Sequence, residues 1–471
     1  MNATLARMGE SARPRISHSD KPDHRFADLG LTAFLGIYLA LHYGLLVVAE
    51  SYQPSLLDEV TMLALLPMAL LAMRARQAVV TFALFGVYLA FLIGSAFVFD
   101  PGGIAQPNAA LLAALLDVKM VIFIIGMFGI FHYVEDKQTV FIRLAQLCIA
   151  FFLLNVPFAL RDYVGDGTSI KGIPLSAKSG LIQPHGLTGH QVEFAWCAAA
   201  GALGAAYLYK RRPTSRTLAL ALLGLLFTLL SLSLKEIAGC VLGLFIILRP
   251  SQQIGRAAKV VFATLFGGLT YAALYYSGIF AVAFEHVGMF VGDDAIETVR
   301  ARMFSASAEI AAWRFPLGSG GGTFGSAPSY RDGYSNLYFL YGISALDGGS
   351  PANPMFLQDV FWPKILAEAG IFGLLAYVAT LLYCAKGLRL RDANPQGSHA
   401  LISRYCVAWL VFVLFVSSAS AALTSEYLIL FVGIAFAYSL HIAYVNAQHR
   451  TVSVEPAHPV AYPRGRPANP A

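Results

Sequence analysis

Long apolar segments separated by short polar ones follow one another along most of the chain. A helix needs about 17 to 25 apolar residues to cross a hydrocarbon core of roughly 30 Å. Segments of that length occur at 29–49, 56–73, 77–99, 112–133, 139–160, 190–209, 260–280, 365–385, 404–422 and 427–445. The pattern predicts an all-α polytopic membrane protein.

One further apolar segment, residues 217–248, is long enough for two short helices. It is interrupted only at residues 233–236, and basic sequences flank it on both sides. Because Lys and Arg collect on the cytoplasmic side of membrane proteins, both flanks should lie on that side, and the segment should cross twice. The chain is then expected to have about 12 transmembrane helices, with both termini cytoplasmic.

The composition agrees with membrane insertion and argues against a soluble or nucleic-acid-binding protein. Of the 471 residues, 57% are hydrophobic and 13% are charged, against roughly 25% charged residues in soluble domains. The formal net charge of +6 comes largely from the basic segments that the positive-inside rule explains, so no nucleic-acid partner is expected. All five cysteines lie in apolar segments, which is typical of buried thiols.

The polar segments divide the chain into five expected regions. These are a basic cytoplasmic tail (1–27), transmembrane helices 1–9 (28–280), a large periplasmic loop (281–364), transmembrane helices 10–12 (365–445) and a Pro-rich disordered cytoplasmic tail (446–471). A loop of about eighty residues is too long for a plain connection. We therefore expect the large loop to carry helices on the outer membrane surface.

Several residues of the large loop suit a ligand site. Arg300 and Arg302 lie on a predicted surface helix at 295–314, where guanidinium groups can face lipid headgroups or bind a phosphate bidentately. Gly320 and Gly322 follow that helix and suit either a tight turn or backbone-amide contacts to a phosphate or sugar.

Two tyrosines of the same loop, Tyr334 and Tyr338, suit either an aromatic belt at the membrane interface or a face for a sugar ring. In the loop at 161–189, His185 precedes the next apolar segment and His190 opens it, so that both suit a helix terminus or a contact to acceptor or phosphate. A zinc site needs three or four ligands at suitable spacing, and the sequence has no such cluster, so neither a metal nor another cofactor is expected.

Charged residues inside apolar segments are costly and usually functional or paired. Lys235 occupies the interruption at 233–236, and Lys119 with Asp117 lies in the segment 112–133. Lys235 is expected at or just below the outer surface, where it is either paired with its neighbour Glu236 or part of a site.

The large loop passes into the next apolar helix through Asp359, Trp362, Lys364 and Glu368. Trp362 and Lys364 suit anchors at the membrane interface. The spacing places Asp359 about two and a half helical turns ahead of Glu368.

Two stretches here resemble the O-antigen ligase and Wzy-type polysaccharide polymerase superfamily. They are RMFSASAEIAAWRFPLGSGGGTF at 302–324 and DVFWPKILAEAGIFG at 359–373. The topology resembles that family over the whole chain, and the motifs do so at about 180–194, 229–240 and 300–375. The Glu-x-Gly-x-x-Gly element of the ligases stands intact from Glu368, but Asp359 occupies the place of their histidine. The chain therefore looks closer to exopolysaccharide polymerases.

The resemblance implies a GT-C-like fold in the bacterial inner membrane and a metal-independent, inverting glycosyltransferase. Its donor and acceptor would be glycans linked to a polyprenyl diphosphate such as undecaprenyl diphosphate, and a chain-length regulator is a further possible partner. Arg300, Arg302 and Lys235 would hold the diphosphate, and Asp359 would face the acceptor hydroxyl. A ligase that transfers glycan to a lipid or protein, and a flippase or transporter for lipid-linked sugar, remain alternatives.

Overall fold

The computed structural model consists almost entirely of helices. It describes residues 25–43, 55–98, 107–165, 167–170, 172–178, 181–188, 190–249, 298–331, 333–388, 398–425 and 427–452. The helices that follow the apolar segments are α1 (Arg25–Tyr43), α2 (Ser55–Ala72), α3 (Arg76–Val98), α4 (Pro107–Tyr133), α5 (Lys137–Val164), α6 (Gln191–Arg211), α7 (Ser215–Leu230), α8 (Leu234–Leu248), α14 (Phe361–Ala385), α15 (Ser398–Val416) and α16 (Ile429–Val452).

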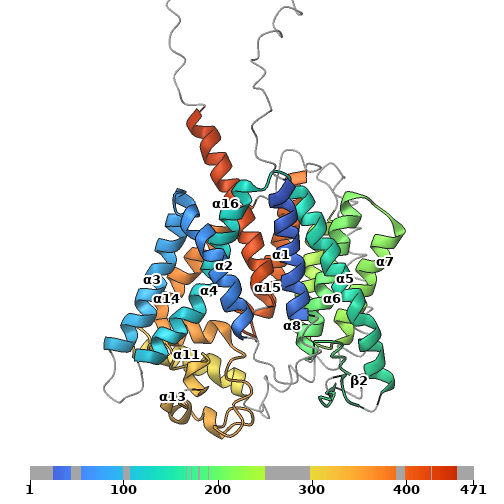
Figure 1. Ribbon diagram of the computed structural model, residues 1–471. Coiled ribbons are helices and arrows are strands. Elements are labelled where there is room, and N and C mark those ends of the chain that lie inside the picture. Colours follow the sequence, from blue (N-terminus) through green and yellow to red (C-terminus); the bar gives the residue numbers. More distant parts are fainter. Residues whose placement is uncertain are drawn as a thin grey trace, which may run out of the picture.

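The remaining elements are short and lie together at one end of the molecule (Figure 1). They are the antiparallel strands β1 (Ala177–Lys178) and β2 (Leu181–Ile182), the helices α11 (Val299–Trp313), α12 (Pro328–Arg331) and α13 (Asn336–Leu340), and the 3-10 turn η4 (Ile343–Ala345). We call this end of the molecule the α11 end.

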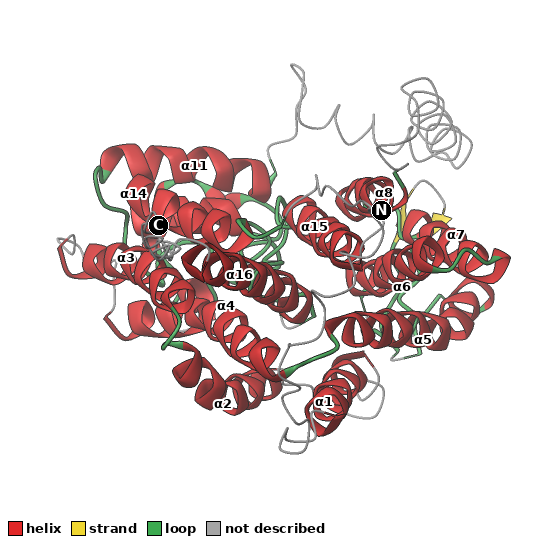
Figure 2. Cartoon of the chain, turned by 90° about the horizontal axis from the view of Figure 1, so that it is seen from above, coloured by secondary structure: helices red, strands yellow, loops and turns green. Residues whose placement is uncertain are grey.

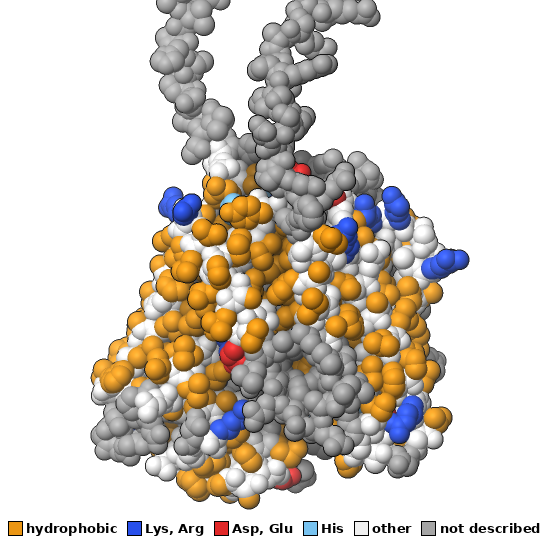
Figure 3. Space-filling view, viewed as in Figure 1, with side chains coloured by type: hydrophobic (Ala, Val, Ile, Leu, Met, Phe, Trp, Pro, Cys, Tyr) orange, Lys and Arg blue, Asp and Glu red, His pale blue; other side chains and the backbone are white. Residues whose placement is uncertain are grey.

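Seven helices of the described chain are long and apolar enough to cross a membrane. They are Arg76–Val98, Asn108–Tyr133, Lys137–Val164, Gln191–Arg211, Phe361–Ala385, His399–Val416 and Ile429–Gln448, and three shorter apolar helices accompany them at Leu29–Ala40, Glu59–Ala72 and Ser215–Leu230. The face in Figure 3 has a broad hydrophobic band, with Lys and Arg mainly along its upper edge. These features fit the expected membrane protein, whereas the number of 12 spans stays a prediction.

The helices form two bundles. In the first bundle α2, α3 and α14 pack around α4 and α16, and α11 packs against α14; in the second bundle α5, α7, α8 and α15 surround α6, and α1 packs on α5 (Figure 2). The two bundles meet where α15 packs against α16. The α11 end therefore contains loops from both bundles.

Small residues allow the helices of the second bundle to approach closely. A Cβ at Gly224 of α7 would lie 2.7 Å from the backbone nitrogen of Ala202 in α6, and one at Gly239 of α8 would lie 3.0 Å from the Phe412 ring of α15. In a bilayer, where apolar burial between helices gains little, such close backbone packing is a main source of association. Gly224 and Gly239 are therefore packing residues.

Some predicted boundaries shift. The segment 217–248 does form two helices, since the chain turns at Ser231–Ser233 with Leu232 at a φ of 55°. The expected span at 404–422 begins six residues earlier, as α15, because Ser403 and Arg404 are buried against other helices. Residues 446–452 were expected to be irregular but continue α16. The expected span at 260–280, residues 1–24 and residues 453–471 lie outside the described residues.

The described part of the loop 281–364 folds around a small apolar core of its own, as expected for a loop of this length. Val299, Met303 and Ile310 of α11 pack there with Phe324, Leu337, Tyr338, Ile343, Leu357, Val360 and Ala367. This core lies against the start of α14, so it fixes the chain that leads into that helix.

Candidate functional site

The Gly-rich segment, residues 318–325, is hydrogen-bonded to the start of α14. The Glu368 carboxylate is fully buried and accepts hydrogen bonds through Oε1 from the amides of Thr323 and Phe324, each at 2.9 Å, and from the Ser326 hydroxyl at 2.6 Å. Gly370 interrupts the helix with a φ of 72°, and a Cβ there would lie 2.5 Å from the carbonyl carbon of Leu317. The Glu-x-Gly-x-x-Gly element thus joins helix to loop.

Gly320 and Gly322 lie in the same segment and pack closely against neighbouring helices. The Gly320 amide donates to the Glu368 carbonyl at 3.0 Å. A Cβ at Gly320 would lie 2.7 Å from Ala96 of α3, and one at Gly322 would lie 2.7 Å from Ala109 of α4. The Gly320 amide and Oε1 of Glu368 are thus used within the protein, whereas the buried Oε2 of Glu368 has no hydrogen-bond partner among the described residues. Substrate contacts of Gly320, Gly322 and Glu368 stay a prediction beside this structural role.

The two predicted tyrosines are likewise used inside the α11 end. Tyr338 is fully buried, and its hydroxyl accepts from the Gly325 amide at 2.8 Å and lies 2.6 Å from the Ser329 hydroxyl. The half-buried Tyr334 donates to the Gly349 carbonyl, and desolvation raises its pKa to about 12. Their rings stabilise the small core, and a sugar contact of either tyrosine stays a prediction.

Arg300 and Arg302 point in different directions, because they stand two residues apart on α11. Arg300 forms an ion pair with Asp359 and lies over the Phe356 ring, 4.7 Å from its centroid. Arg302 instead donates through Nε to the Tyr341 carbonyl at 2.7 Å, with Glu309 near its guanidinium. The structure therefore brings Arg300 to Asp359 and holds Arg302 to the loop after α13.

Lys235 approaches the same place from the second bundle. Its ammonium group donates to the Ala419 carbonyl and lies 3.7 Å from the buried carboxylate of Glu236. Glu236 is held in turn by the Trp196 indole, which donates at 3.2 Å, and by the Ser233 hydroxyl. Only 18% of the Lys235 side chain is exposed, so its charge is held in place at the end of α8.

His185 and His190 lie near Lys235, Arg300 and Asp359. Their rings stack with centroids 6.2 Å apart and an interplanar angle of 28°. The charges of Asp359 and Arg300 act on Lys235, and those of Asp359 and Lys235 act on His190. Five of the residues selected from the sequence, on four separate stretches of chain, therefore meet at the α11 end: His185, His190, Lys235, Arg300 and Asp359.

We call these five residues the charged cluster. Side-chain exposure is 40% for Arg300 and 33% for Asp359, so a ligand can reach both. Three of the cluster's buried polar atoms have no partner among the described residues: Nε of Arg300 and both ring nitrogens of His185. Buried polar atoms are normally satisfied, and orphaned ones beside exposed charges favour a ligand-binding role.

Two residues that the sequence did not single out position the histidines. The Asp162 carboxylate of α5 accepts from the amides of His185 and Gly186 at 2.8 and 2.9 Å, and Asn155 accepts from the Leu187 amide at 3.0 Å. Both are buried. Their signal in the sequence was a polar residue within, and another just beyond, the apolar segment 139–160, which indicates a buried hydrogen-bond partner.

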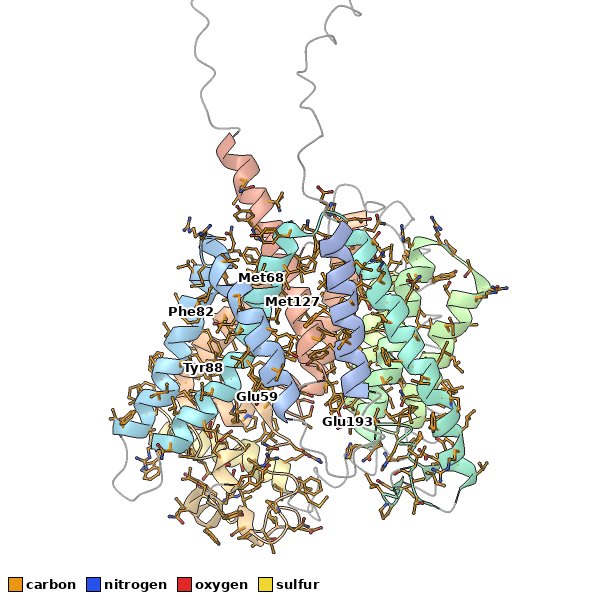
Figure 4. All side chains as sticks on the ribbon, viewed as in Figure 1. Glu59, Met68, Phe82, Tyr88, Met127 and Glu193 are labelled. Carbon is orange, nitrogen blue, oxygen red and sulfur yellow. The ribbon has the colours of Figure 1, made fainter. Side chains whose placement is uncertain are left out.

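Two further charge pairs lie within the first bundle. Lys364 was expected as an interface anchor but is buried, and its ammonium group lies 2.6 Å from the Asp117 carboxylate. Tyr88 donates to the second oxygen of Asp117 at 2.5 Å, and Lys119 pairs with Glu59. Figure 4 shows Tyr88 and Glu59 in the half of this bundle nearer the α11 end.

In the described chain, no group of three or more His, Cys, Asp and Glu side chains is placed to hold a metal ion. Comparison with protein-family models and with curated protein sequences found no match to the chain. The geometry of the charged cluster and the motifs of the sequence are therefore the grounds on which a function can be proposed.

Proposed function

We propose that the protein is a membrane glycosyltransferase that polymerises glycan repeat units carried on a polyprenyl diphosphate, at the periplasmic face of a bacterial inner membrane. The observation that carries the proposal is the convergence of Lys235, Arg300 and Asp359 at the α11 end, beside the ends of apolar helices. Such a site combines cations for a diphosphate with a carboxylate for a hydroxyl, next to the expected position of the lipid chain.

The proposed reaction transfers a glycosyl group with inversion. A hydroxyl oxygen of the acceptor glycan attacks the anomeric carbon of the donor, and the bond from that carbon to the diphosphate oxygen breaks. The bonding electrons leave with the polyprenyl diphosphate, and the hydroxyl proton passes to a carboxylate, for which Asp359 is the candidate. The leaving group gains negative charge, so preorganised cations contribute most to the rate.

Lys235 and Arg300 are suited to that charge in different ways. The Lys235 ammonium group is held by a carbonyl and by Glu236, so little side-chain movement is needed when an anion arrives. Arg300 is already paired with Asp359, but its guanidinium has five N–H donors, and 40% of the side chain is exposed. A phosphate oxygen can therefore bind Arg300 without displacing Asp359.

A polymerase function is preferred to a ligase function because Asp359 occupies the position at which the ligases have histidine. In the flippase alternative, Lys119, Asp117 and Lys235 would line a cavity within the membrane. Lys119 is paired with Glu59 and Asp117 with Lys364, while Lys235 lies beside Glu236 at the α11 end. These pairings favour glycosyl transfer over transport.

The test uses cells that depend on this chain for their polysaccharide. Asp359→Ala and Arg300→Ala should each leave single repeat units on the lipid carrier at the periplasmic face, where gels of wild type show long chains. Arg331→Ala, an exposed cation of the same loop, is the matched control and should keep the long chains. Unchanged chains in both site variants would refute the assignment, and repeat units trapped at the cytoplasmic face would favour the flippase.

A further inference from the structure

His190 occupies a position that fixes which ring nitrogen carries a proton. It is the N-cap of α6, and its Nδ1 accepts a hydrogen bond from the Val192 amide at 3.2 Å. An accepting nitrogen must present its lone pair, so in the neutral ring the proton is on Nε2. Within the described part of the chain, nothing bonds to Nε2.

The surroundings of His190 also keep the ring neutral. Its side chain retains an exposed surface, yet the protein around it is dense enough for desolvation, with His185 and Lys235, to lower its pKa to about 4. Asp359 acts in the opposite direction but does not prevail. The positive end of the α6 dipole also disfavours a second proton, while the Glu193 carboxylate in the first turn of α6 favours one.

The neighbouring His185 ring does not change this assignment of the proton to Nε2. His185 stacks on it and is buried, and neither ring nitrogen of His185 has a hydrogen-bond partner among the described residues, although Gln191 lies near. Desolvation lowers the pKa of His185, against the opposing effects of Asp162 and Gln191. The stacked pair is therefore two neutral rings at neutral pH, and His190 is near enough to Asp359 and Lys235 for both charges to act on its ring.

We propose that His190 is a fixed, neutral hydrogen-bond donor to an oxygen of the diphosphate in the charged cluster, and not a general base. A base would need a bare Nε2, but the N-cap bond uses the bare nitrogen of the neutral ring. The identity of the ligand rests on the proposed function. His190 adds a donor without a further cation, which complements Lys235 and Arg300 as the leaving group gains charge.

Two substitutions separate the donor from the cap. His190→Asn keeps an oxygen where Nδ1 lies and so keeps a good N-cap, but it has no group that reaches the Nε2 position. His190→Gln places an amide N–H near the Nε2 position and caps poorly. The donor role predicts that the Asn variant folds like wild type and loses function, whereas the Gln variant is less stable and recovers function.

The first readout is binding of farnesyl diphosphate, a short polyprenyl diphosphate, to the purified full-length chain in lipid nanodiscs. His190→Asn should raise Kd about tenfold, the usual order for one hydrogen bond to a charged group, and His190→Gln should recover most of that loss. Equal Kd values for wild type and both variants, or a loss in the Gln variant as large as in the Asn variant, would overturn the proposal.

The second readout is the ¹⁵N spectrum of the histidines, with His190 assigned by the signal lost in His190→Asn. The proposal requires a protonated Nε2 and a bare Nδ1 from pH 6 to 8; a bare Nε2 or a charged ring in that range would refute it. A chain that shows this tautomer and this binding pattern but never extends a glycan would refute the proposed function alone. A chain that extends glycan equally well with Asn at 190 would refute the role of His190 alone.

Discussion

Lys364 and Asp117 form a buried ion pair in the first bundle. The two residues lie 247 positions apart in the sequence, and their charged atoms are 2.6 Å apart with Tyr88 as a third partner. A buried ion pair adds little over an apolar pair of the same shape, but a single buried charge without its partner is costly. The pair thus holds α14 against α4 mainly because separating the two helices would leave each charge buried without its partner.

Lys364→Met should therefore destabilise the protein by about 3–5 kcal/mol, because Asp117 is left buried without a cation. The double variant Asp117→Asn with Lys364→Met should recover most of the loss, because no buried charge remains. Denaturant unfolding in detergent measures both. Equal stabilities of the single and double variants would contradict the ion-pair account.

Acid should weaken the protein partly through His190. Its pKa of about 4 in the folded chain lies below the value of about 6.5 in an unfolded chain. Between those values the unfolded chain binds a proton that the folded chain does not, so stability falls as the pH falls from about 6.5 towards 4. The melting temperature of His190→Asn should drop less than that of wild type between pH 7 and 4.5, and equal drops would contradict the lowered pKa.

At the scale of elements, the interruption of α14 at Gly370 determines how the α11 end sits on the first bundle. The φ of 72° and ψ of −176° belong to a region that glycine alone occupies readily. The gap in the helix admits the Gly-rich segment, whose amides at Ser319 and Gly320 donate to the carbonyls of Ala367 and Glu368. Helix and segment therefore form one unit.

Gly370→Ala should destabilise the protein by more than about 1–3 kcal/mol, the usual cost of a strained backbone, because the new Cβ would also meet Leu317. Gly86→Ala is the control: it lies in α3 with nothing within 4 Å of its Cβ, and helix propensity favours Ala there by about 1 kcal/mol. Thermal unfolding compares the two. Similar melting temperatures for both variants would contradict the role of the interruption.

Apolar length and basic flanks predicted most helices, including the two within 217–248, because burial in a bilayer depends on composition along the chain. The same reasoning could not predict that Lys364 is buried, since its partner Asp117 lies on a helix distant in sequence. Gly320, Gly322 and Glu368 were selected as ligand contacts because their amides and carboxylate were not yet assigned partners. Only the fold shows that the Gly320 amide bonds to the Glu368 carbonyl and that the Glu368 carboxylate bonds to Thr323, Phe324 and Ser326.

At the scale of the whole molecule, the charged cluster draws on both bundles. Arg300 and Asp359 belong to the first bundle and its loop, while Lys235 and the two histidines belong to the second. The Trp362 indole of α14 also donates to the Ser417 hydroxyl after α15 at 3.0 Å, across the same boundary. A site built in this way is complete only when the bundles are packed together, which explains why no single motif of the sequence describes it.

The most direct test of the central claim is to count the polyprenyl diphosphate that the purified chain releases from a carrier-linked glycan in lipid nanodiscs. Wild type should release one molecule for each glycosidic bond formed. Lys235→Met should be slower by about 10²-fold or more, whereas Arg331→Met, outside the charged cluster, should stay within about twofold of wild type. Release by Lys235→Met at the wild-type rate, or no release by wild type, would contradict the assignment of the charged cluster as the transfer site.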